Sequence, residues 1–462
     1  RTYAFSGLKK SMNRLLRMIA ALPYESYGKS FAENYLQGFL EDGADMGESL
    51  EKLWEGGWLE KRGGGYSMHP FIAECMLAKP LTEEDAAPFF ESVYAVCTSA
   101  SQGFRIESVR EFFFNPPAEN SGAGGELQKA LSFVYSVAQK LSGGLCEQFL
   151  QLILLAAESA YCLLGFDKEK LHYLMGLKQN CRNASAATQA YWYTVLSTYN
   201  YEDTQELERA YEKYTKGGLV SKEICLAFTN ALALRHLQKG NAGRARELAQ
   251  YIWDNAQDLD SKMGACYIMA ESLEQEGDLE GCFAWGERGE EIGRSSKNKN
   301  TWNRHQIMFF QCVINIAVGK FETVKRILEE EQESLKNDKS YFYKFQLLFY
   351  WGSYKLGIGE EGYGIVQLTE ACKMAKIVFS TAEGAYYATC LTELAMAYNK
   401  AGCREEACEC YKKVLRIYDT VEGHAFERHR ILNNMGVMYL DWEKPEEALT
   451  CLEEAYRLGV DM

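Results

Sequence analysis

The chain has 462 residues, of which 47% are hydrophobic, and a net charge of −14. A chain of this length exceeds one compact core, so we expect several domains or a repeat array. We expect no membrane span, because no apolar stretch reaches about 18 residues. The acidic excess, all of it beyond residue 80, argues against nucleic-acid binding there. The 15 scattered cysteines indicate a reduced, cytoplasmic protein.

Residues 1–80 are predicted to form a small domain of three helices and one hairpin. Pro23 is predicted to end the first helix. Ser30 and Glu33 form a capping-box pattern at the start of the second helix. The Gly56-Gly57 pair is predicted to end the third. The strings "WLEKR" and "YSMH" flank a turn at residues 63–65 and predict two paired strands. Three helices followed by a hairpin are typical of a winged-helix domain.

Many winged helices bind DNA through the helix that precedes the hairpin. Here that helix carries three acidic residues, Glu48, Glu51 and Glu55, but only one basic residue, Lys52. Phosphates would repel such a helix. We therefore expect no direct contact between this domain and nucleic acid.

The next two segments are predicted to be helical. Residues 81–124 are expected to form a helical linker region, in which the string "NPPAENSGAGG" at 115–125 predicts a loop. Residues 125–219 are expected to form degenerate helical repeats. The chain has no proline from 118 to 444, which suits long uninterrupted helices.

Residues 220–462 contain an internal repeat. The segment "LTELAMAYNKAGCREEACECYKKVLRIY" aligns with "LNNMGVMYLDWEKPEEALTCLEEAYRL" nearer the C-terminus. Small residues recur with spacings of 37, 42, 40, 43 and 41 residues, at Ala233, Ala270, Cys312, Gly352, Ala395 and Gly436. This pattern resembles the tetratricopeptide repeat, whose usual unit is about 34 residues. We therefore expect a mainly α fold, in which a winged-helix domain is followed by an α-solenoid of lengthened helix pairs.

Stacked helix pairs curve into a superhelix with a concave binding face, which the first helix of each pair should line. Aromatic rings and amides at such positions suit a peptide or protein segment. The expected ligand residues are Asn230, Leu234, Tyr267, Glu271, Phe309, Gln346, Phe349, Thr392, Asn399, Arg430 and Asn433. The alternative role of each aromatic residue is to pack against the next repeat.

The string "MHP" stands between the predicted hairpin and the next helix. This order, followed by helical repeats, resembles the C-terminal part of STAND-type (NB-ARC) regulatory ATPases, which include bacterial maltose-activator-type regulators. The resemblance implies that Met68 and His69 face ADP bound in an upstream nucleotide-binding domain, and that His69 contacts its β-phosphate in the inactive state. A second, compatible role for His69 is to cap the helix that begins at Pro70.

The chain contains no G-x-x-x-x-G-K-[ST] string. We therefore expect the ATP-binding core to lie N-terminal to Arg1, so that ADP or ATP is implied only for a longer protein. Without that core we expect no enzymatic activity and no cofactor in this chain. We also expect no metal site, because the six histidines are spread out along the sequence.

Two functions remain. In the first, the chain is the sensor and regulatory half of such a protein: the repeats bind a peptide, protein or small-molecule trigger, and the winged helix couples it to the nucleotide-binding domain. In the second, it is a stand-alone repeat scaffold or a peptide-pheromone receptor without an ATPase.

Overall fold

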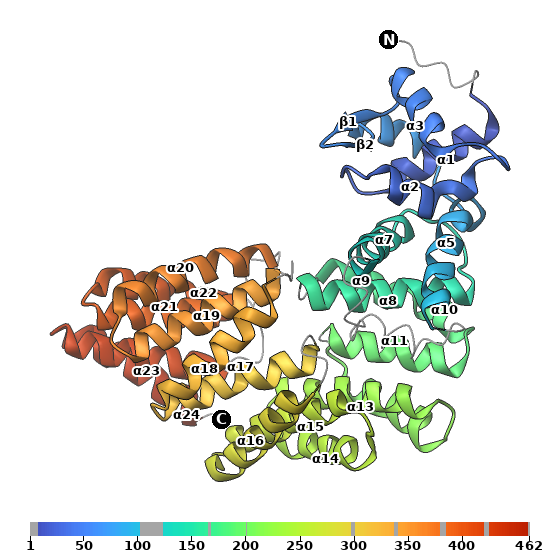
Figure 1. Cartoon of the computed structure of the whole chain (residues 1–462). Helices are drawn as coiled ribbons and strands as arrows, with labels where there is room; N and C mark the ends of the chain where they lie inside the picture. Colours follow the sequence, from blue (N-terminus) through green and yellow to red (C-terminus); the bar gives the residue numbers. More distant parts are fainter. Residues whose placement is uncertain are drawn as a thin grey trace. The chain divides into compact units, whose positions relative to one another are not determined.

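The computed structural model describes residues 8–101, 123–164, 168–199, 201–296, 301–336, 341–378, 385–419 and 425–460. These residues are mainly helical (Figure 1). They fall into two compact units. Unit 1 comprises Arg1–Ala160, Glu169–Ser197 and Gln205–Phe228, and unit 2 comprises Tyr161–Lys168, Thr198–Thr204 and Thr229–Met462. No described helix is long and apolar enough to cross a lipid bilayer.

Unit 1 begins with the predicted helices and hairpin. The elements are α1 (Lys10–Ala21), α2 (Lys29–Leu36), a 3₁₀ turn (Gln37–Phe39), α3 (Met46–Glu55), β1 (Glu60–Arg62), β2 (Gly65–Ser67) and α4 (Pro70–Met76). The capping box expected at Ser30 is wrong. Helix α2 already starts at Lys29, after Gly28, and no side chain caps it. The side chain of Asp45 does cap α3, accepting a hydrogen bond from the Glu48 N–H.

The hairpin is built on a tight glycine turn. Gly63 and Gly64 have φ of 55° and 81°, the left-handed conformation that a two-residue hairpin turn needs. Gly65 is already in β2, opposite Arg62. A Cβ atom there would lie 2.6 Å from the carbonyl oxygen of Tyr27, so the third glycine lets two backbones approach closely.

The other described residues of unit 1 are mainly helical. It contains α5 (Glu83–Ser101), α7 (Ala123–Ala138), most of α8 (Glu147–Leu164), α9 (Lys168–Gly176), α10 (Lys178–Arg182), α11 (Ala186–Thr198), α12 (Thr204–Tyr211) and a π-helical turn (Glu212–Lys216). Phe31 of α2 meets Phe133 of α7 edge-on, with ring centroids 5.2 Å apart. The loop expected over 115–125 lies outside the described residues, except for its last three, which begin α7.

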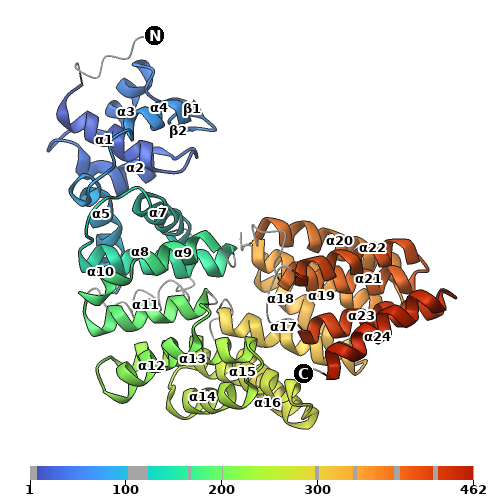
Figure 2. The same cartoon turned by 180° about the vertical axis from the view of Figure 1, so that it is seen from behind.

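Residues 222–460 form antiparallel helix pairs, as the repeats predict (Figure 2). The pairs are α13 (Lys222–Gln238) with α14 (Ala242–Asn255), α15 (Leu259–Gln275) with α16 (Leu279–Ser295), α17 (Trp302–Ala317) with α18 (Phe321–Ser334), α19 (Tyr341–Gly357) with α20 (Glu361–Val378), α21 (Ala385–Lys400) with α22 (Arg404–Asp419), and α23 (Ala425–Asp441) with α24 (Pro445–Val460). The second helix of a pair packs on the first helix of the next, as α20 does on α21 and α22 on α23.

The turn inside each pair repeats one backbone feature. The second residue after the end of the first helix has a positive φ, and it is Gly240, Gly277, Gly319, Gly359, Gly402 and finally Glu443. These positions are 37, 42, 40, 43 and 41 residues apart, the same spacings as those of the small residues in the sequence. The predicted register of all six repeats is therefore confirmed.

The small residues lie where the two helices of a pair cross. A Cβ atom on Gly352 would come within 2.7 Å of Leu368 Cγ, and one on Gly436 within 2.6 Å of Leu452 Cγ. Ala395 is fully buried at the equivalent crossing. Close packing at these points allows the helices of each pair to approach each other.

Candidate functional site

Five side chains on the first helices of three pairs form one polar and aromatic cluster. Tyr267 and Glu271 are four residues apart on α15, so they share a face of that helix. Tyr350 lies on α19, and Tyr386 and Glu393 lie two turns apart on α21. Burial first, and then neighbouring acidic groups that include Glu271, raises the pKa of the tyrosine on each helix. We call these five residues the first-helix cluster.

The two carboxyl groups of the cluster are poised to change charge near neutral pH. Burial raises the pKa of Glu271 to about 7, against a hydrogen bond with Tyr267 that lowers it. Burial likewise raises the pKa of Glu393 to about 7, although nearby Arg430 and the neighbouring Ser353 hydroxyl lower it. Desolvation dominates in both cases, because removal from water penalises the ionised form.

The cluster is nevertheless not sealed from solvent. Tyr386 is 45% exposed, while Tyr267, Glu271, Tyr350 and Glu393 are half-buried. Ligand-binding residues are often partly buried by their neighbours and still accessible from solvent, as these side chains are.

Several polar atoms on first helices are buried without a hydrogen-bond partner among the described residues. They include Oε2 of Glu271, Nε2 of Gln306 and Oε1 of Gln346. Gln346 is only 5% exposed and lies one turn before Tyr350 on the same face of α19. Buried polar groups are normally satisfied, so these atoms indicate where a ligand can supply the missing bonds.

Aromatic packing holds the tyrosines in place. The ring of Phe309 stacks on Tyr350, with centroids 5.1 Å apart and planes 13° from parallel. Phe310 meets Tyr267 edge-on at 5.6 Å, and Phe345 meets Tyr386 edge-on at 6.3 Å. The rings of the cluster are therefore supported by a second layer of rings, which restricts their rotamers.

The structure brings together only some of the residues expected to contact a ligand. Tyr267 and Glu271 belong to the cluster, Gln346 lies beside Tyr350, and the exposed Arg430 interacts electrostatically with Glu393. The remaining candidates that reach solvent are half-buried or exposed: Asn230, Leu234, Phe349, Asn399 and Asn433.

Two expected ligand residues are buried and, unlike the equally buried Gln346, already have their contacts within the array. Phe309 is 1% exposed and supports Tyr350 from behind. Thr392 is 4% exposed, and its hydroxyl donates to the Ala388 carbonyl of its own helix at 2.9 Å. Each side chain packs within the array, so neither is available to a ligand.

Sequence reasoning missed Tyr350, Tyr386 and Glu393. Tyr350 could have been found, because it lies one helical turn after Gln346. Glu393 is the direct neighbour of Thr392, so the expected register of α21 was rotated by one residue. One residue turns a helical side chain by about 100°, enough to exchange a buried position for an open one.

His69 occupies the junction between the hairpin and α4. Its Nδ1 accepts a hydrogen bond from the Phe71 N–H at 3.2 Å, which makes it the N-cap of the helix that begins at Pro70. The His69 side chain is exposed, whereas Met68 is 5% exposed. The cap predicted from the sequence is therefore confirmed, and it uses only one of the two ring nitrogens.

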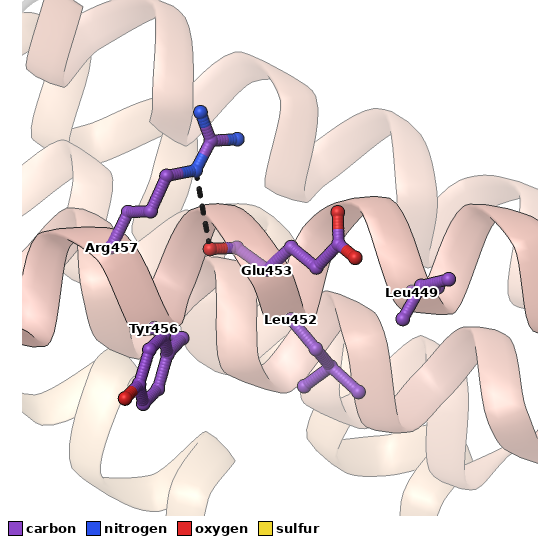
Figure 3. Close-up of a pocket in the computed structure, with 5 residues that line it drawn as sticks. All are labelled: Leu449, Leu452, Glu453, Tyr456 and Arg457. Atoms are coloured by element: carbon purple, nitrogen blue, oxygen red, sulfur yellow. Dashed lines mark hydrogen bonds between the residues drawn. The ribbon is translucent and has the colours of Figure 1, made fainter.

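A shallow apolar pocket lies on α24, the last helix of the array (Figure 3). It is lined by Leu449, Leu452, Glu453, Tyr456 and Arg457, and the Arg457 Nε donates to the Glu453 carbonyl at 3.4 Å. No group of three or more histidine, cysteine or acidic side chains suited to a metal ion occurs in the described part of the chain.

Residues 386–458 match the family model of the tetratricopeptide repeat. No curated protein matches the chain. The solved structures similar to it include the APC/C hetero-tetramer Cut9-Hcn1, at 12% identity and a TM-score of 0.50, covering 96% of this chain and 76% of that one.

Two further similar structures have lower TM-scores. They are a STAND protein with a tetratricopeptide-repeat sensor, PH0952 from Pyrococcus horikoshii (16% identity, TM-score 0.37, 97% of this chain and 58% of that one), and human IFIT1 with PPP-AAAA (14%, 0.43, 98% and 96%). The family match shows tetratricopeptide repeats over residues 386–458, and the described helix pairs that precede them have the same two-helix architecture.

Proposed function

We propose that this chain is the non-catalytic sensor and regulatory part of a cytoplasmic STAND-type signalling or transcription-regulating protein. In this proposal the tetratricopeptide arm binds a peptide or protein trigger. Residues 1–80 act as a winged helix that couples the arm to a nucleotide-binding domain of a longer protein. ADP and ATP belong to that domain.

The observation that carries this proposal is the geometry of His69. Because Nδ1 accepts the bond from Phe71, the neutral imidazole carries its proton on Nε2. Among the described residues no group bonds Nε2, and the side chain is exposed. An outward N–H at a fixed position beside a helix start is suited to donate a charge-assisted hydrogen bond to a phosphate.

The first-helix cluster supports the ligand-binding half of the proposal. It offers rings, carboxyl groups and unpartnered amide atoms on the helices that line the concave face in such repeats. The chain has no phosphate-binding loop motif. We therefore expect the isolated chain to hydrolyse no ATP and to bind ADP weakly at most. Stoichiometric micromolar ADP binding in calorimetry would contradict its assignment as the sensor part.

Two substitutions of His69 separate its two roles. His69→Ala removes both the cap and the outward donor, whereas His69→Asn keeps a capping side chain. A hydrogen bond to a charged group is worth about 1.5–3 kcal/mol. If that bond forms only in the closed state, either variant of the longer protein should release ADP roughly 10- to 150-fold faster and show higher basal output.

The stability readout distinguishes the alternatives. Loss of the cap alone should cost about 1 kcal/mol, and only in His69→Ala. Unchanged ADP release and basal output in both variants, with a lower melting temperature for His69→Ala alone, would leave His69 as a helix cap and refute the coupling role. A longer protein without any nucleotide-binding domain would favour the stand-alone scaffold or pheromone receptor.

A further inference from the structure

We propose that the first-helix cluster binds the lysine or arginine side chain of an extended peptide, with the Glu271 carboxylate as partner of the cation. Tyr267, Tyr350 and Tyr386 would surround the aliphatic stem and the charge. This inference rests on the proposed ligand-binding role of the arm and specifies the chemistry of its trigger.

The first step is that the cluster lacks hydrogen bonds a ligand would complete. Oε2 of Glu271 and Oε1 of Gln346 are buried acceptors without a partner among the described residues. An unsatisfied buried polar group destabilises the folded protein. Both atoms are acceptors, so the group that satisfies them must be a donor. Ammonium and guanidinium groups carry several donors and no acceptor.

The second step is that no cation of the chain serves Glu271. Within the described residues it takes part in no ion pair, and the groups that influence its pKa besides burial are Tyr267 and Glu274. Glu393, in contrast, already has Arg430 nearby. Arg430 therefore partly balances the charge of Glu393, whereas no cation of the described residues balances that of Glu271.

The third step is that the surroundings suit a cation better than an anion or an apolar group. An anion would be repelled by Glu271 and Glu393, and an apolar ligand would leave Oε2 of Glu271 unpaired. Tyrosine rings attract cations over their faces, and the cluster contributes rings from α15, α19 and α21. The aliphatic stem of lysine or arginine packs well against such rings.

The fourth step is that amide side chains occur on first helices before the cluster and within it. Asn230 lies on α13, Gln306 on α17 and Gln346 on α19, so first helices of three different pairs present amide groups. Amides pair with peptide N–H and C=O groups, and a chain running across several repeats can meet all three. An extended peptide uses this spread of polar groups, which a small amine would leave unused.

Selection from a displayed library of random peptides tests the inference directly. The wild-type chain should select peptides enriched in lysine or arginine at one position. Glu271→Gln removes the charge and keeps the shape of the side chain, and it should abolish this enrichment. Glu287→Gln, at an exposed position on α16, is the matched control and should preserve it.

Binding of one selected peptide then isolates the contact. Replacing its basic residue by alanine should weaken binding to the wild type about tenfold or more, which corresponds to about 1.4 kcal/mol, and should have little effect on Glu271→Gln. Because the carboxylate must be ionised, wild-type affinity should rise about tenfold between about pH 6 and about pH 8. The Glu271→Gln variant should lose most of this dependence and keep only the part that comes from Glu393, whose pKa is also about 7.

The possible failures are distinguishable. Selected peptides without basic enrichment, or enrichment that survives Glu271→Gln, would overturn the cation site and leave a peptide-binding arm intact. If no peptide is selected by a chain that remains folded by circular dichroism, both the cation site and the peptide-binding function are refuted.

Discussion

Replacing Glu443 by glycine should stabilise the last repeat. Glu443 has φ of 58°, the only positive φ outside glycine in the described residues, and it stands where the five preceding repeats have glycine. The left-handed conformation costs an ordinary L-residue about 1–2 kcal/mol. Glycine avoids this cost, but its greater conformational freedom in the unfolded chain offsets about 0.5–1 kcal/mol of the stabilisation. We therefore expect a net gain of about 0.5–1 kcal/mol.

Amide hydrogen exchange can measure this gain in stability helix by helix. Repeat arrays open unit by unit, so the effect should appear in α23 and α24 and fade towards earlier pairs. A gain of this size slows exchange through local opening by about 2- to 5-fold. The Glu443 side chain is exposed, so little packing is lost with it.

Gly402→Ala is the reciprocal control in the preceding pair. Gly402 has φ of 79°, and no atom lies within 4 Å of an added Cβ. The substitution should therefore weaken α21 and α22 through the backbone alone, by about 1 kcal/mol. Faster exchange in α23 and α24 of Glu443→Gly, or no change in either variant, would refute the account of these turns.

Three further predictions concern packing and charge. Gly436→Val should lower the free energy of unfolding by about 1–3 kcal/mol in urea denaturation, because its Cβ would clash with Leu452. Glu331→Gln should cost about 3–5 kcal/mol, because it removes the carboxylate that pairs with the buried Arg304 guanidinium at 2.6 Å. Because folding raises the pKa of Glu271, the folded state holds its proton longer, so stability should fall as pH rises from about 4.5 to 7, by about 1–3 kcal/mol. Glu271→Gln should remove this contribution and leave the similar one of Glu393.

The sequence contained enough information for the repeats and the hairpin. Small residues at helix crossings and glycines seven residues later are required by close approach and by positive φ, so their spacing fixed the register even where Glu443 replaced glycine. The hairpin followed from three glycines, two for the turn and Gly65 for its contact with Tyr27. Both are local constraints that one residue type satisfies.

The first-helix cluster could be predicted only in part, because it depends on how helices from separate pairs converge. Helical periodicity found Tyr267 and Glu271 on one face of α15. It missed Glu393, since an error of one residue along α21 turns the side chain by about 100°. The raised pKa of Glu271 also depends on burial by neighbouring helices, which no local pattern encodes.

Photo-crosslinking of a selected peptide tests the central claim most directly, that the first helices of the tetratricopeptide arm form the sensor site. The peptide would carry a benzophenone beside its basic residue, and the linked positions would be mapped by mass spectrometry. The account predicts crosslinks to α15, α19 and α21. Crosslinks confined to the exposed apolar face of α24 around Leu449 and Tyr456, or to unit 1, would contradict it.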